Sequence, residues 1–208
     1  MKRVIFSLLL TSLSGIALGC SSSSSGGGGG GNNPAPPALG AQIDRMGRPA
    51  VQTATNHTFD TNDSAKGAAK DAWNANSGPT TWVSSYTSEI EKNLAILDSL
   101  DTVCGNQLFA DKTKTDASRY GTLASVLADD RIWVNTAGST CTTYLAVEAN
   151  ATNLLANSDC GGRKPSYDVM KITYSAVAAG ALMGVTDGTT AVPAKTSGTT
   201  FPYLASPQ

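Results

Sequence analysis

A run of low complexity near the N-terminus limits how much of this 208-residue chain can fold. Serines and glycines fill positions 21–31, and asparagines and a Pro-Ala-Pro-Pro stretch extend the run to residue 37. Such a segment has too little apolar surface to offset the chain entropy lost on folding. We therefore expect residues 20–40 to form a flexible, disordered tether, which leaves residues 41–208 for a single globular domain.

An apolar leader precedes the tether. Lys2 and Arg3 stand before the run 4–18, whose polar members are only serine, threonine and glycine. About 15 residues is shorter than the ~20 that a membrane-spanning helix needs, so residues 1–19 are expected to be an export signal. Without Lys2 and Arg3, thirteen basic residues would face sixteen acidic ones. Nothing in that balance favours nucleic-acid binding.

The leader ends in Ala17-Leu18-Gly19-Cys20, which resembles the cleavage box of bacterial lipoproteins. In such a box small residues admit a peptidase, and the thiol of the following cysteine takes a diacylglyceryl group. The resemblance implies that Cys20 anchors the protein to a membrane of the cell envelope. Ser21, rather than aspartate, after the cysteine implies the outer membrane, on its periplasmic or surface face. The alternative is an ordinary secretory signal that ends near a cysteine.

Apolar residues at helical spacing predict a mainly α, loop-rich domain of about five helices with minor short strands. The clearest helix runs from 83 to about 102, with one apolar face formed by Tyr86, Ile90, Leu94, Leu97 and Leu100. Pro79 is expected to break the chain before it. The other predicted helices are 64–73, 116–130, 142–156 and 165–183. Residues 132–134 are expected to be extended, and the terminal Phe201-Pro202-Tyr203-Leu204 to pack back as an apolar clip.

One disulfide is expected, because an acylated Cys20 leaves Cys104, Cys141 and Cys160 in an oxidising compartment. A continuous helix over 142–156 would extend about 21 Å, and the four residues after it could return at most about 14 Å. A Cys141–Cys160 bond is therefore disfavoured. Alternating helix directions favour Cys104–Cys141, with Cys104–Cys160 as the second pairing. A three-cysteine metal site and three free thiols are the alternatives, although neither C-x-x-C spacing nor a fourth ligand is visible.

Few polar side chains could carry chemistry. His57 is the only histidine and has no nucleophile signature beside it, so a turn or surface position is favoured. Asp60 and Asp63 are spaced as a calcium loop begins, but alanine stands where an EF-hand needs glycine, which favours turn and helix-cap chemistry. Asp129 and Asp130 should point to different sides and be solvated. No catalytic residue, cofactor or metal site is predicted, since no nucleotide, zinc or hydrolase motif is present.

The segment 43–50, Ile-Asp-Arg-Met-Gly-Arg-Pro-Ala, is the most distinctive stretch. Guanidinium groups suit phosphate and carboxylate, so Arg45 and Arg48, with Asp44 and Asp168, are candidate ligand or anion contacts. The alternative is that the two arginines pin an irregular N-terminal segment to the domain through buried pairs with Asp44 or Asp168.

The segment 43–50 is the first of five sequence motifs. Together they resemble the C-terminal half of a bacterial family of exported proteins and lipoproteins of unknown function. The later motifs, in the same order, are Val134-Asn135-Thr136-Ala137, Gly162-Arg163 with Asp168-Val169, Thr186-Asp187-Gly188 and Phe201-Pro202-Tyr203-Leu204-Ala205-Ser206-Pro207. Tyr167, Lys171 and Thr173 replace acidic positions of the longer members. The resemblance implies a related fold without an acidic cation site, and no catalytic residue, because the family carries no established activity.

Taken together, the sequence predicts a cell-envelope lipoprotein that acts as a non-catalytic binding or structural module. Its expected partners are the membrane, through the lipid, and an envelope protein. One alternative is an envelope hydrolase that would use Asp44, Arg45, Arg48, His57 or Asp168, and it requires these side chains to converge in one cavity. The other alternative is a cation-binding lipoprotein.

Replacing the lipidated thiol tests the anchoring. Cys20→Ala should release the protein from membranes and leave the leader uncut by the lipoprotein peptidase, because no acyl chain can be attached. Membrane fractionation and intact-mass measurement report both effects. A Cys20→Ala protein that remained in the membrane fraction would contradict the lipid anchor.

Overall fold

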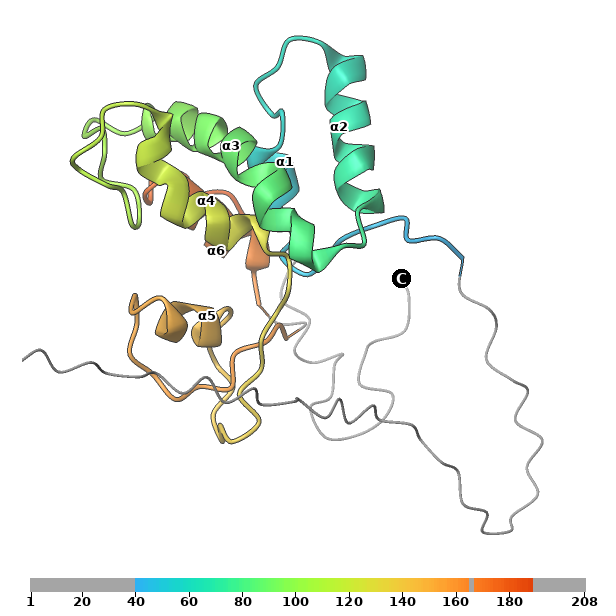
Figure 1. Cartoon of the computed structure of the whole chain (residues 1–208). Coiled ribbons are helices and arrows are strands. Elements are labelled where there is room, and N and C mark those ends of the chain that lie inside the picture. Colours follow the sequence, from blue (N-terminus) through green and yellow to red (C-terminus); the bar gives the residue numbers. More distant parts are fainter. Residues whose placement is uncertain (1–39, 165–166, 189–208) are drawn as a thin grey trace, which may run out of the picture. The chain divides into compact units, whose positions relative to one another are not determined.

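The structure, a computed structural model, describes residues 40–164 and 167–188. The expected export signal, Cys20, the tether up to residue 39, the Pro165-Ser166 helix start and the C-terminal clip lie outside the described residues. Within the described part the domain is mainly helical, as predicted (Figure 1). It has six α-helices and one 3₁₀ helix there, where about five helices were expected. Over the same ranges, no helix has both the length and the apolar character needed to cross a membrane.

The first helix, α1 (Val51–Thr55), is short, and two longer helices come directly after it in the chain. Helix α2 (Asp63–Ala75) begins after Asn62, whose side chain accepts the Ala65 N–H at 3.0 Å, so Asn62 rather than the expected Ser64 is the cap. Helix α3 (Pro79–Asp98) begins at Pro79 instead of after it. A proline suits the first helical position because the N–H that it lacks would have no helical partner there.

Helix α4 (Gly121–Ala128) lies beside α3 (Figure 1) and continues the 3₁₀ helix η1 (Ala117–Tyr120). The predicted cap is confirmed, since the Asp116 side chain accepts the Ser118 N–H at 3.1 Å. Apolar faces of α3 and α4 form the centre of the core, and α1, α2 and α6 (Val169–Val177) add to it. The core contains Val51, Trp73, Ile90, Leu94, Leu97, Leu123, Leu127 and Val177.

A buried carboxylate ties the loop after α3 to this core. Asp98 accepts hydrogen bonds from the Tyr120 hydroxyl and the Gly105 N–H, both at 2.6 Å. Burial raises the pKa of Tyr120, and its hydrogen bond to Asp98 raises it further. The pair therefore fixes the end of α3 against η1.

Asp168 caps the N-terminus of α6, where its side chain accepts the Lys171 N–H at 2.8 Å. The predicted helix to residue 183 is too long, because the chain turns at Ala179 and Gly180, which both have positive φ angles of 49° and 87°. On the inner side of α6, the Thr173 hydroxyl donates to the Pro49 carbonyl at 3.1 Å and joins α6 to the 43–50 segment.

The predicted helix 142–156 is mostly absent, and this overturns the expected disulfide. Helix α5 spans only Ala146–Ala151, because Leu145 before it has a left-handed φ of 58°. The chain returns over a short distance, and Cys141 pairs with Cys160 at a Cα–Cα distance of 4.9 Å. Cys104 is free and exposed. The predicted Cys104–Cys141 and Cys104–Cys160 pairings were wrong, because the long helix that was expected to keep Cys141 and Cys160 apart is absent.

The minor strands are not confirmed. In the described ranges the expected extended segment contributes only one isolated bridge, between Val134 and Gly161. Asp159 organises the turn beside the disulfide, where its carboxylate accepts the Thr142 N–H at 2.8 Å and the Gly161 N–H at 2.9 Å. The hydrogen bonds from Thr142 hold the pKa of Asp159 below its ordinary value.

Peptide mapping without reduction tests the disulfide. We expect one cross-linked peptide pair containing Cys141 and Cys160, and complete alkylation of Cys104 in the native protein, because its side chain is exposed. Mapping after reduction provides the control. A Cys104 cross-link to either of the other two residues would contradict the observed fold of residues 141–160.

Candidate functional site

The arginines of the 43–50 segment are buried, and their guanidinium groups lie against helix ends. Arg45 donates to the carbonyls of Trp73 in α2 and Ala128 in α4, at 3.4 and 3.2 Å, and Arg48 donates to the carbonyl of Val126 in α4. Carbonyls in the last turn of a helix have no further helical N–H to bind, and a cation is favourable there. The arginines thus cap the C-terminal ends of α2 and α4.

Arg45 is also enclosed by aromatic rings. Its guanidinium carbon lies 3.9 Å from the Trp82 ring centre, 4.1 Å from that of Trp73 and 5.3 Å from that of Tyr86. Burial lowers the pKa of Arg45, and the charge of Asp130 opposes that change. The nearest Asp130 oxygen is 4.0 Å from Arg45 Nε, an ion pair too long to be a hydrogen bond. Arg45 is only 6% exposed, so its guanidinium faces the protein interior rather than an external anion.

Asp130 holds the backbone of the segment. Its carboxylate accepts the Gly47 and Arg48 N–H groups at 3.0 and 2.8 Å, and the residue is buried. The expectation that Asp130 is solvated was wrong, because the backbone of a distant segment covers it. Asp129 points elsewhere, as expected, and pairs with Arg131 through two 2.8 Å hydrogen bonds that lower the pKa of Asp129.

The predicted ligand contacts do not form one site. Asp44 is exposed and accepts the N–H of Arg45, while Asp168 caps α6. Neither is the partner of an arginine in the ion pairs found, which join Arg45 to Asp130 and Arg48 to Glu148. The two arginines therefore pin the segment to the domain, with different acids from those expected.

A cavity of about 490 Å³ lies over the second of these ion pairs. We call it the Trp133 groove. Ten residues line it: Arg48, Val83, Ser125, Val126, Asp129, Trp133, Val147, Glu148, Ala151 and Thr152. Glu148 Oε1 lies 3.6 Å from Arg48 Nη2 and accepts the Trp133 N–H at 3.1 Å. Glu148 Oε2, although buried, has no hydrogen-bond partner among the described residues.

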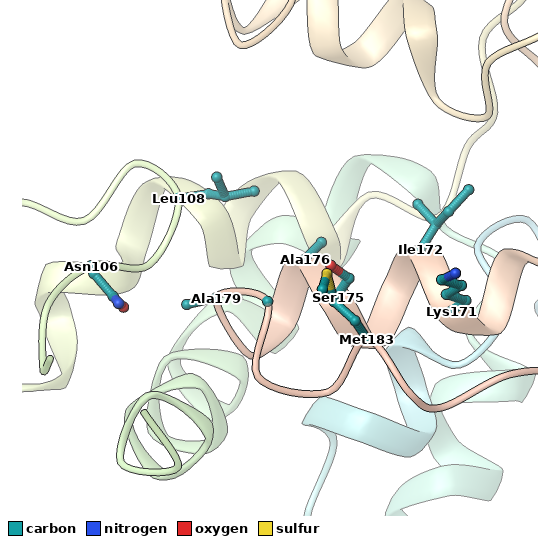
Figure 2. A pocket seen from close by; sticks show the side chains of 9 residues that line it. Asn106, Leu108, Lys171, Ile172, Ser175, Ala176, Ala179 and Met183 are labelled. Carbon is teal, nitrogen blue, oxygen red and sulfur yellow. The ribbon is translucent and has the colours of Figure 1, made fainter. Parts of the chain in front are cut away.

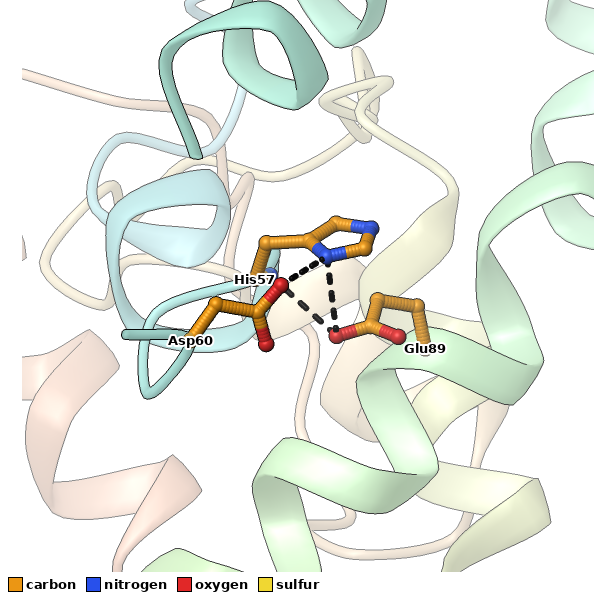
Figure 3. A group of neighbouring side chains, drawn as sticks. All are labelled: His57, Asp60 and Glu89. Carbon is orange, nitrogen blue, oxygen red and sulfur yellow. Dashed lines mark hydrogen bonds and ion pairs between the residues drawn. The ribbon is translucent and has the colours of Figure 1, made fainter. Parts of the chain in front are cut away.

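The only histidine lies in a second cavity, of about 310 Å³. His57 Nδ1 is 2.7 Å from Asp60 Oδ2 and 3.9 Å from Glu89 Oε1, and Figure 3 shows both carboxylates directed at the imidazole. Asp63 is not part of this group and pairs with Lys66 at 2.7 Å, so the calcium-loop spacing is not used as such. The sequence did not single out Glu89.

A third cavity, of about 460 Å³, lies along α6 (Figure 2). Its lining is mostly apolar, with Leu108 across from Ile172 and Ala176 of α6, and Met183 is exposed at its edge. Lys171 is its charged lining residue. These features make it an open apolar surface without a convergent polar group.

No protein-family model, curated protein or solved structure matches this chain. The structure itself shows a helical domain in which Arg45 and Arg48 cap the C-terminal ends of α2 and α4. The family resemblance over residues 43–207 stays an expectation drawn from the sequence.

Removing the enclosed cation tests its structural role. Arg45→Ala should lower the free energy of unfolding by about 3–5 kcal/mol, because it leaves Asp130 buried beside an empty aromatic cage. Arg45→Lys should also destabilise the domain, since an ammonium group cannot bind the carbonyls of two helices as a planar fork. Urea unfolding measures both effects.

Arg131→Ala is the matched control. This arginine is also ion-paired, but it is exposed, so its removal should leave the free energy of unfolding nearly unchanged. An Arg45→Ala protein as stable as the control would refute the capping role.

Proposed function

We propose that this protein is a cell-envelope lipoprotein whose helical domain is a non-catalytic binding module. Acylated Cys20 would anchor it, and a flexible tether of about 17 residues, with a root-mean-square span of roughly 20–25 Å, would hold the domain clear of the bilayer surface. The leader, the Cys20 box and the tether composition support the anchoring. The observation that carries the binding role is the Trp133 groove.

The Trp133 groove has the composition of a recognition site. Trp133 and Val83 are 48% and 40% exposed, and the charges of Asp129 and Arg131 lie beside this apolar surface. Large exposed apolar side chains rimmed by polar groups are typical of interaction surfaces. The mostly apolar lining beside the charges of Asp129 and Arg131 favours a partner that presents an apolar side chain together with polar groups. A segment of an envelope protein has both.

The envelope-hydrolase alternative receives no support from the described residues. Arg45 and Arg48 are helix caps in the interior, Asp168 is the cap of α6, and Asp44 is exposed. His57 lines a different cavity from Arg48. The convergence that the hydrolase requires is absent among these five side chains.

Site-specific photo-crosslinking in intact cells tests the binding role. A photoreactive residue at position 83, in the Trp133 groove, should give a defined adduct with an envelope protein, identified by mass spectrometry. The same residue at Ile172, which is 39% exposed on another cavity, is the matched control and should not give this adduct.

A second substitution makes the result specific. Trp133→Ala should reduce the adduct from position 83, because it removes the large apolar contact of the groove. Identical adducts from positions 83 and 172, or an adduct insensitive to Trp133→Ala, would refute the groove as the binding surface.

A further inference from the structure

Three side chains of metal-ligand type converge at the cavity around His57. His57 and Asp60 belong to the turn that follows α1, and Glu89 projects from α3 (Figure 3). One ligand atom from each, His57 Nδ1, Asp60 Oδ2 and a Glu89 oxygen, lies within 4.8 Å of the other two. The fold therefore brings together groups that are 29 to 32 positions apart in sequence, and only Asp60 and His57 are sequence neighbours.

Two hydrogen bonds hold Glu89 in place. Asn93, which is buried, donates to Glu89 Oε1 at 2.7 Å, and the His57 backbone N–H donates to the same oxygen at 3.3 Å. The side-chain amide oxygen of Asn93, Oδ1, in turn accepts the Thr58 N–H at 3.2 Å. Outer hydrogen bonds of this kind orient the ligands of metal sites and reduce the entropy lost when an ion binds.

We propose that His57, Asp60 and Glu89 form a binding site for one divalent transition-metal ion, with Zn²⁺ as the best fit. Zinc binds imidazole nitrogen and carboxylate oxygen at about 2.0–2.2 Å, which places tetrahedral ligand atoms about 3.4 Å apart. The observed His57–Asp60 and His57–Glu89 separations of 2.7 and 3.9 Å lie on either side of that value. Small side-chain rotations in the open cavity complete the geometry.

The donor set distinguishes zinc from calcium. Calcium takes six to eight oxygen ligands, whereas this site offers one nitrogen and two carboxylates. Three protein ligands leave a fourth position that faces the cavity of about 310 Å³, so a water molecule or a partner side chain can complete the tetrahedron. This inference goes beyond the proposed function and depends on neither Cys20 nor the Trp133 groove.

Lys92 gives the site a built-in opposing charge. Its ammonium group lines the same cavity and lies 3.3 Å from Glu89 Oε2, the oxygen not directed at His57. A cation at this distance competes electrostatically with a metal ion. Removing the charge of Lys92 should therefore strengthen metal binding, an effect that a damaged fold would not produce.

Titration calorimetry with Zn²⁺ tests the site in the full chain, carried in a Cys20→Ser, Cys104→Ser background without a histidine tag, so that neither thiol outside the Cys141–Cys160 bond and no tag can bind zinc. We expect one ion per chain. His57→Asn should weaken binding at least about tenfold. Asparagine is chosen because the φ of His57 is 54°, a left-handed conformation that asparagine tolerates. Asp60→Asn, at an exposed position, gives a second loss-of-ligand variant.

Two matched variants complete the experiment. Lys92→Gln should increase the affinity at least about threefold, while Lys66→Gln, which removes a charge that pairs with Asp63, should leave it unchanged. Co²⁺ substitution should give the visible absorption of a tetrahedral ion, lost in His57→Asn. No binding at about millimolar Zn²⁺, or binding unaffected by both His57→Asn and Asp60→Asn, would overturn the proposal.

Discussion

The buried guanidinium of Arg45 is the interaction on which the arrangement of the helices depends. A charge in the interior is tolerated only when its surroundings replace the water that it loses, and here carbonyls of α2 and α4, Asp130 and three aromatic rings do so. Two of those rings belong to α3, so three helices meet at one cation. Gln42, three residues before Arg45, donates to the Asn74 carbonyl at 2.7 Å and so also binds the C-terminal end of α2. A short irregular segment thus sets how α2, α3 and α4 pack.

The same segment supports both candidate binding regions. Arg48 holds Glu148, and with it α5, over the Trp133 groove. Helix α3 carries Val83 in that groove and Glu89 in the cavity around His57. The two regions therefore share one helix but use different residues of it. A ligand at either one contacts α3, whose core face of Ile90, Leu94 and Leu97 is fully packed.

The sequence predicted the elements whose cause is local. The apolar spacing of α3 from Tyr86 to Leu97 and the cap at Asp116 need only neighbouring residues, and both are present. Leu100, predicted on the same face, lies past the end of α3 and is exposed. The conformation of residues 142–156 could not be predicted, because a left-handed φ is uncommon at a leucine and no neighbouring residue signals it at Leu145. The partners of Arg45 and Arg48, Asp130 and Glu148, lie 85 and 100 positions away. Charge alone could not select them from sixteen acidic residues, so the fold class was predictable while the pairings were not.

Gly47 illustrates how such a frame constrains variation. A β-carbon built on this residue would lie 1.7 Å from the Asp130 carbonyl oxygen, a separation that no side chain can adopt. Every replacement must push apart the backbones that the Asp130 carboxylate joins. A deep mutational scan would consequently rank this position among the most intolerant of the domain, although it faces neither groove nor ligand. Such intolerance would reflect the close backbone contact between Gly47 and Asp130, and not a role in binding or catalysis.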